Sequence, residues 1–144
     1  MSMTLNFSPC VFVADDDEDD RFLIHKAFSQ INPECRLYFL TDGSELLKAL
    51  NKTSILPSLI VLDLNMPNLN GLETLMLIRR NSKYDSVPIA MLTTSSDTAD
   101  RERAYELKVN EFITKPTDHT SLKVIASKLR EQYLLGKCID ACGC

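Results

Sequence analysis

Short apolar runs alternate along this chain with longer segments in which apolar residues recur at the spacing of a helix. The runs are Val11–Ala14, Arg36–Leu40, Leu59–Leu62, Pro88–Leu92 and Phe112–Thr114, and each is typical of a β-strand. Leu59–Leu62 is wholly apolar, as expected for a strand buried on both faces, whereas Arg36–Leu40 is more polar and is predicted to lie at a sheet edge. The alternation predicts five consecutive βα units and therefore a parallel sheet.

The segments between these runs carry helix signals. The first has an inward stripe of Ile24, Ala27, Phe28 and Ile31, which follows a run of acids and ends before Pro33. Further helices are expected through Leu46, Leu47 and Leu50, from Gly71 through Leu72, Leu75 and Ile78, over Ala99–Leu107, and through Leu122, Ile125, Ala126, Leu129 and Tyr133. The predicted fold is a single doubly wound α/β domain.

Polar residues follow four of the predicted strands at the point where each strand ends. They are Asp15 and Asp16, Asp63, Thr93 and Thr94, and Lys115 with Pro116. In an open α/β sheet the ligand site lies beyond the carboxyl ends of the strands. We therefore expect these carboxylates, a hydroxyl and an ammonium group to share one pocket.

The residue types in this pocket suit a divalent cation and a phosphoryl group. Two carboxylates about 4 Å apart repel by roughly 4 kcal/mol at an effective dielectric constant near 20, and a hard cation such as Mg²⁺, or Mn²⁺ in its place, relieves that repulsion. Asp63 ends the most apolar strand and is the best-placed nucleophile, since an aspartate can attack a phosphoryl group. Lys115 offers a positive charge and Thr93 a hydroxyl donor to phosphoryl oxygens.

Each of these residues also has an ordinary structural explanation. An aspartate after a strand is often a helix cap, a threonine pair can do the same, and a lysine before proline is usually a surface loop. Asp17, Glu18 and Asp20 are expected to form only a solvated helix start. The functional interpretation depends on the four polar positions occurring together, each after a β run.

Composition narrows the class of protein. The chain has 144 residues, 44% of them apolar and 25% charged, with a net charge of −4, which argues against nucleic-acid binding. No basic segment precedes the apolar stretch Cys10–Ala14, and the longest apolar runs are far short of the roughly 20 residues that cross a bilayer. We expect a soluble cytoplasmic protein with no membrane partner.

The five cysteines are an odd number, which fits a reducing compartment better than a disulfide framework. Cys10 and Cys35 are expected as small core residues. Cys138, Cys142 and Cys144 crowd into the end of the chain, where their spacing is compatible with a metal or redox site and equally with a frayed terminus.

Four motifs together resemble the receiver domain of two-component response regulators, the CheY-like family. They read VFVADDDEDDRFLI, LIVLDLNMPNLNGLE, IAMLTTS and FITKP, and the resemblance covers Cys10 to Tyr133. It implies a flavodoxin-like five-stranded sheet in the order 2-1-3-4-5 with helices on both faces. It divides the chain into an N-terminal extension (1–9), a receiver domain (10–134) and a cysteine-containing tail (135–144).

The resemblance also implies roles for individual residues. Asp63 would be the phospho-acceptor, Asp16 a direct ligand of Mg²⁺, Asp15 a ligand through water, and Asn65 a ligand through its backbone carbonyl. Thr93 and Lys115 would bind the phosphoryl group, Phe112 would be the aromatic residue that moves inward on switching, and the bond before Pro116 would be cis. One departure is Lys108-Val109, where the family often has Gly-Ala.

The implied function is a phosphorylation-dependent switch with no output domain of its own. Its phosphoryl donor would be a sensor histidine kinase or a histidine phosphotransfer protein, and the long acidic stretch together with TTS resembles the stand-alone receivers of phytochrome-like and hybrid kinases. Its downstream partner is not specified by the sequence. Tyr133, Leu134 and Leu135 extend the apolar character of the last helix and suggest a homodimer contact.

Three other functions could be carried by a similar sheet, and the sequence argues against each of them. An aspartyl phosphohydrolase on a similar sheet needs a second acid two residues after the nucleophile, where this chain has Asn65. A flavin- or nucleotide-binding domain needs a glycine- or hydroxyl-rich phosphate loop after the first strand, where DDDEDD would repel phosphate. A docking module without phosphorylation is disfavoured because every expected site residue is present.

Overall fold

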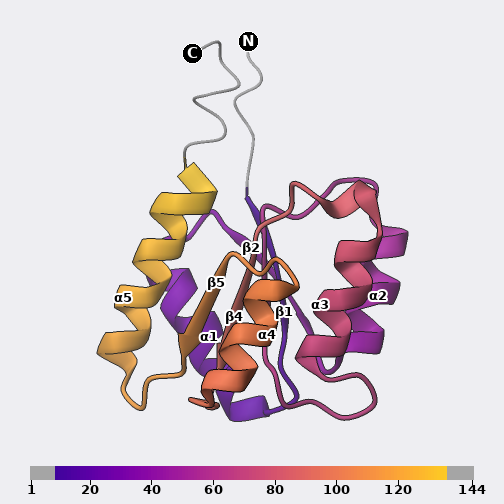
Figure 1. The fold of residues 1–144 in the computed structure, drawn as a ribbon. Helices are drawn as coiled ribbons and strands as arrows, with labels where there is room; N and C mark the ends of the chain where they lie inside the picture. The colour runs from indigo at the N-terminus through magenta and orange to yellow at the C-terminus, as the bar shows by residue number, and fades with distance from the viewer. Residues whose placement is uncertain (1–8, 136–144) are drawn as a thin grey trace, which may run out of the picture.

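The computed structural model describes residues 9–135 and contains one parallel sheet of five strands in the order β2-β1-β3-β4-β5 (Figure 1). The strands are β1 (Cys10–Ala14), β2 (Arg36–Leu40), β3 (Leu59–Leu62), β4 (Ile89–Thr93) and β5 (Glu111–Thr114). The helices are α1 (Glu18–Ile31), α2 (Gly43–Lys52), α3 (Gly71–Arg80), α4 (Thr98–Glu106) and α5 (His119–Leu129), with a short 3-10 helix at Ser82–Tyr84 and a π-helical turn at Arg130–Leu135. The predicted fold class, strand order and edge position of Arg36–Leu40 are confirmed.

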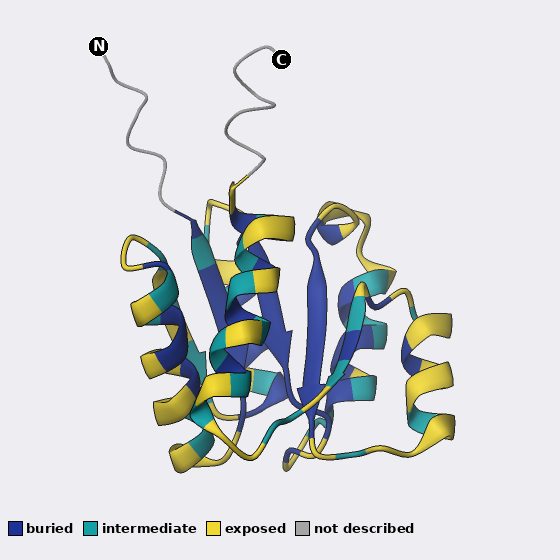
Figure 2. Ribbon diagram, turned by 90° about the vertical axis from the view of Figure 1, so that its left-hand side faces the viewer, coloured by how far each residue is buried: buried dark blue, intermediate teal, exposed yellow. Residues whose placement is uncertain are grey.

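Alternating residues of each strand face two separate hydrophobic clusters. Along β1, Phe12 and Ala14 pack with buried residues of α2 and α3, whereas Val11 and Val13 pack with buried residues of α1 and α5. The sheet is therefore the middle of three layers, with dark buried strands between helices whose outer surfaces are exposed (Figure 2). Because both faces are covered, the central strands are apolar except for Thr93 at the end of β4.

Each of the five helices begins at an Asp or Asn that accepts a hydrogen bond from the first turn. The caps are Asp17, Asp42, Asn70, Asp97 and Asp118, and Asn70 forms a full capping box with Glu73. In a parallel sheet the helices start beyond the carboxyl ends of the strands. The same edge of the sheet therefore collects capping aspartates as well as those predicted to bind a ligand.

At the opposite end of the sheet, one guanidinium donates hydrogen bonds to three uncharged oxygens. Arg79 donates to the backbone oxygens of Lys108 (3.0 Å) and Tyr84 (2.9 Å) and to Oδ1 of Asn110 (3.0 Å), which in turn accepts from the backbone N–H of Ile89 (2.8 Å). Lys108 itself has φ 70°. This left-handed conformation explains why a glycine is the usual residue there, and it costs a lysine about 1 kcal/mol.

The last helix packs back onto its own domain more than its sequence suggested. Leu134 is only 4% exposed and joins the cluster under α1 and α5. The hydroxyl of Tyr133 donates to Glu111 at 2.8 Å. Of the apolar residues expected to support a homodimer contact, only Leu135 is exposed.

Cys10 and Cys35 are half-buried at the margins of the two clusters rather than in their centres. Burial raises the pKa of both thiols, that of Cys35 to about 11. The three C-terminal cysteines lie outside the residues that the structure describes. Within residues 9–135, no helix is long and apolar enough to cross a membrane.

Candidate functional site

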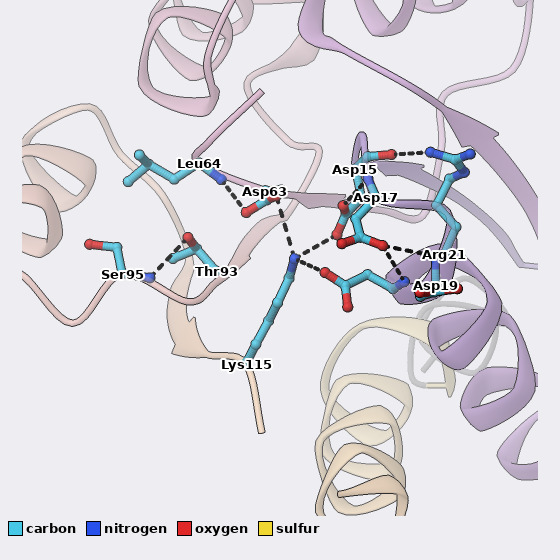
Figure 3. Close-up of polar contacts among 10 residues, drawn as sticks. Asp15, Asp17, Asp19, Arg21, Asp63, Leu64, Thr93, Ser95 and Lys115 are labelled. Atoms are coloured by element: carbon cyan, nitrogen blue, oxygen red, sulfur yellow. Dashed lines mark hydrogen bonds and ion pairs between the residues drawn. The ribbon is translucent and has the colours of Figure 1, made fainter. Parts of the chain in front are cut away.

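The sheet brings the predicted polar positions to one edge. Asp15 and Asp63 directly follow β1 and β3, Thr93 ends β4, and Lys115 directly follows β5. The strand ladders continue into them, since the N–H of Asp63 donates to the carbonyl of Ala14 (2.9 Å) and that of Lys115 to the carbonyl of Thr93 (2.7 Å). These backbone bonds fix where each side chain begins. Figure 3 shows that the side chains of Asp15, Asp63, Thr93 and Lys115 lie together at this edge of the sheet.

Three carboxylates come close enough together to hold a metal ion. Asp15, Asp16 and Asp63 each offer one oxygen, and these oxygens lie within 4.8 Å of one another. Asp15 and Asp63 are buried, and Asp16 is exposed. One oxygen of each buried carboxylate is oriented by a backbone donor: the N–H of Asp17 donates to Oδ1 of Asp15 (3.0 Å), and that of Leu64 to Oδ1 of Asp63 (2.8 Å). An all-oxygen donor set that is open on one side fits Mg²⁺ or Mn²⁺.

The ammonium of Lys115 lies among carboxylates from three segments of the chain. Its Nζ is 2.8 Å from Asp15 Oδ2 and 3.4 Å from Asp63 Oδ2. It is closest to Asp20 Oδ2, at 2.6 Å. The expectation that Asp20 belongs only to a solvated helix start is therefore wrong, because the first turn of α1 aims this side chain at Lys115. No local pattern signals the contact, since its partners are 95 residues apart in the chain.

Burial sets the charge balance of these groups. It raises the pKa of Asp15 to about 6, although the ion pair with Lys115 and the hydrogen bond from Asp17 act in the opposite direction. It also raises the pKa of Asp63 against the charge of Lys115. Burial alone would lower the pKa of Lys115, but its bonds to Asp15 and Asp20 and the charge of Asp63 raise it above its usual range. The site holds more negative charge than its one cation balances, which favours an additional cation.

Thr93 and Phe112 connect this site to α4. Thr93 is fully buried, and its Oγ1 accepts from the N–H of Ser95 at 3.2 Å. Phe112 is 6% exposed, so its ring lies inward in this structure. Its N–H donates to Tyr105 Oη (3.3 Å), and its carbonyl accepts from Arg101 Nη1 (3.2 Å). The guanidinium of Arg101 also lies 5.8 Å from the Phe112 ring centre. No sequence motif indicates these contacts of Tyr105 and Arg101 in α4 with Phe112.

Two further predicted positions have different outcomes. The side chain of Asn65 is exposed beside the acidic cluster, and its proposed role through the backbone carbonyl stays a prediction. The described residues contain no cis peptide bond, so the prediction of a cis bond between Lys115 and Pro116 is wrong. A trans bond is the preferred form even before proline, by about 0.5–1 kcal/mol. Lys115 reaches Asp15, Asp20 and Asp63 with this bond trans.

Known proteins are similar to this chain in sequence and fold over nearly all of the described residues. The family model of the response regulator receiver domain matches residues 11–127. The probable methanogenesis regulatory protein FilR2 of Methanothrix harundinacea is 30% identical over 86% of this chain and 83% of its own length. Response regulator Rcp1 of Synechocystis is 32% identical over 80% of this chain and 82% of its own length.

Solved structures give the same result. The phosphorylated cyanobacterial phytochrome response regulator RcpA superimposes with a TM-score of 0.83 at 28% identity, covering 90% of this chain and 96% of its own. The Mn²⁺-bound form of Rcp1 gives 0.77 at 28% identity, covering 85% and 92%. The chain belongs to the response regulator receiver domain family, whose members act as switches in two-component signalling.

Proposed function

We propose that this protein is a response regulator whose receiver domain accepts a phosphoryl group on Asp63. The observation that carries the proposal is the convergence of Lys115, Asp15 and Asp16 on Asp63 at the carboxyl edge of the sheet. In the reaction, one Asp63 carboxylate oxygen forms a bond to phosphorus while the bond between phosphorus and the donor atom breaks. Lys115 then binds a phosphoryl oxygen, and Thr93 donates its hydroxyl to another.

Asp15, Asp16, Asp63 and the backbone carbonyl of Asn65 are the groups that would hold Mg²⁺ or Mn²⁺. The bound cation supplies charge neutralisation for the phosphoryl oxygens. The chain contributes orientation, because the N–H of Leu64 fixes one oxygen of Asp63 and leaves the other toward Lys115. Asn65 stands where a hydrolase would need a second acid, so we expect slow loss of the phosphoryl group rather than sustained turnover.

The natural donor in this proposal is a phosphohistidine on a sensor histidine kinase or a phosphotransfer protein in the cytoplasm. A phytochrome-like kinase is supported by the similarity to RcpA, which is itself a phytochrome response regulator. Phosphorylation would draw Thr93 toward the phosphoryl group and alter the surface around Phe112, α4 and α5. A downstream protein would bind this altered surface.

The acceptor assignment is tested by incubating the protein with acetyl phosphate and Mg²⁺. The reaction is stopped with acid, and the mass of the intact protein is then measured. We expect the parent protein to gain one phosphoryl group and the Asp63→Asn variant to gain none. Asp85→Asn is the matched control, because Asp85 is exposed and follows the 3-10 helix before β4. Equal labelling of the parent and Asp63→Asn would refute the assignment.

A further inference from the structure

Asp20 makes the shortest of the carboxylate contacts to Lys115, yet none of the roles proposed above uses it. The distance from Nζ to Asp20 Oδ2 is 2.6 Å, against 2.8 Å to Asp15 and 3.4 Å to Asp63. Lys115 Nζ donates a hydrogen bond to Asp20 and forms ion pairs with Asp15 and Asp63. An ammonium has three N–H donors, so a phosphoryl oxygen that binds Lys115 would be a fourth acceptor competing for them.

Asp20 is held in place by the start of α1. Its backbone N–H donates to the capping carboxylate of Asp17 at 3.2 Å, and its side chain is 31% exposed. The side chain of Lys115 is only 11% exposed. The contact is therefore a partly shielded ion pair between two anchored residues, which strengthens it relative to an ion pair on the open surface.

Phosphorylation of Asp63 changes what competes for this ammonium. The phosphoryl oxygens carry more negative charge than the carboxylate they replace and attract Lys115 more strongly. A contact that Lys115 makes before phosphorylation and loses afterwards stabilises the unphosphorylated form. The free energy of this contact shifts the equilibrium between the two forms toward the unphosphorylated one. The charge of Asp20 also repels the incoming phosphoryl group, which acts in the same direction.

We propose that Asp20 is a positioning residue that competes with the phosphoryl group on Asp63 for Lys115. It draws the ammonium toward α1 and sets how readily the site accepts a phosphoryl group. This inference deepens the proposed function and rests on it, since it assumes that Lys115 binds the phosphoryl group.

The chain offers a matched control one residue away. Asp19 lies in the same turn of α1, its backbone N–H donates to the same oxygen of Asp17 at 2.8 Å, and it is exposed. Among the ion pairs found in residues 9–135, Lys115 pairs with Asp15, Asp20 and Asp63 and not with Asp19. Asp20→Asn and Asp19→Asn therefore remove the same charge from the same turn, and only the first removes a contact to Lys115.

The test titrates the parent and both variants with beryllofluoride, a phosphoryl mimic, in the presence of Mg²⁺, and follows binding by backbone NMR. We expect Asp20→Asn to bind the mimic about fivefold more tightly than the parent, and Asp19→Asn to stay within about twofold. Equal affinities of the two variants, or weaker binding by Asp20→Asn, would overturn the proposal. Backbone spectra of the free variants verify that both are folded.

A second measurement separates this inference from the proposed function. The side-chain ammonium signal of Lys115, assigned with a Lys115→Arg variant, is recorded at fixed pH without the mimic. We expect Asp20→Asn to shift this signal and speed its exchange with water, and Asp19→Asn to leave it unchanged. If the parent neither labels with acetyl phosphate nor binds the mimic, the proposed function fails. The ammonium signal still decides whether Asp20 positions Lys115, and an unchanged signal overturns that claim.

Discussion

Asp42 and Asp118 lie at the same edge of the sheet as Asp15 and Asp63, but their surroundings act on the carboxyl group in opposite ways. Asp42 accepts hydrogen bonds from Glu45 N–H (2.8 Å) and Asn68 Nδ2 (2.8 Å), which lower its pKa. Asp118 accepts from the N–H and hydroxyl of Ser121, and its pKa is lowered too. For Asp15 and Asp63 burial is the largest influence, and it raises the pKa of both.

The difference shows what separates a capping aspartate from one available for chemistry. A cap has its charge satisfied by donors from its own helix turn, so ionisation stabilises the fold. Asp15 and Asp63 are pushed together and out of water with one ammonium to share, so ionisation costs stability until a cation or phosphoryl group binds. The pair that we propose to be functional is therefore also the pair whose ionisation destabilises the fold.

The largest expected effect comes from the glycines beside the two kinds of aspartate. A Cβ on Gly71 would lie 2.3 Å from the carbonyl oxygen of Asp63 and 2.7 Å from Cα of Leu64, so the clash is with backbone. We expect Gly71→Ala to lower the free energy of unfolding by about 3 kcal/mol or more, measured by urea denaturation.

Gly43, next to the cap Asp42, is the comparison. Its Cβ would clash chiefly with Oγ1 of Thr74, a side-chain atom, and would lie at a tight 3.0 Å from Cβ and the carbonyl oxygen of Leu69. Gly43→Ala should therefore be partly rescued by Thr74→Ala. No side-chain change offers Gly71→Ala the same relief, and a Gly71→Ala variant as stable as the parent would contradict the close approach of α3 to Asp63.

The same substitution should have opposite signs at the two kinds of aspartate. Asp63→Asn removes a buried charge from a repelling cluster and keeps an acceptor for the N–H of Leu64, so we expect it to raise the free energy of unfolding by about 1 kcal/mol without Mg²⁺. Asp42→Asn loses one of its two accepted hydrogen bonds and should lower that free energy by about 1 kcal/mol. Changes of the same sign in both variants would remove the distinction.

The smallest expected effect is on the pH dependence of stability. Asp15 has a pKa of about 6 in the folded protein against an ordinary value of 3.8, so the folded state binds more protons than the unfolded state between these pH values. The free energy of unfolding should therefore fall by about 1 kcal/mol as pH rises from 5 to 7. Asp42 and Asp118 have lowered pKa values, so their contribution is present above the unfolded pKa and is lost as pH falls through the folded one.

Stability should thus peak near pH 5, which thermal unfolding in a series of buffers can measure. We expect Asp15→Asn to weaken the fall in stability above pH 5, and Asp42→Asn to weaken the fall in stability below it. A parent protein whose stability rises steadily from pH 5 to 7 would show that burial does not dominate the carboxyl group of Asp15.

Much of this structure was predictable because it depends on short-range patterns. Short apolar runs between stripes of helical period identified all five strands within one residue of their ends, and parallel pairing follows from the βα alternation. Asp15, Asp63, Thr93 and Lys115 could be placed at one edge because a parallel sheet aligns the carboxyl ends of its strands. Their roles in phosphoryl transfer stay predictions.

The tertiary structure decided what depends on contacts between distant segments and on burial. Asp20 looked like its solvated neighbours, and only the packing of α1 beside the end of β5 brings it to Lys115. Asp42 is marked as a helix cap by its own sequence, because Glu45 follows three residues later and its N–H donates to the Asp42 side chain. For Asp63 the deciding surroundings are its burial and its contact with Lys115, and both depend on residues far away in the chain that only the packed sheet brings together.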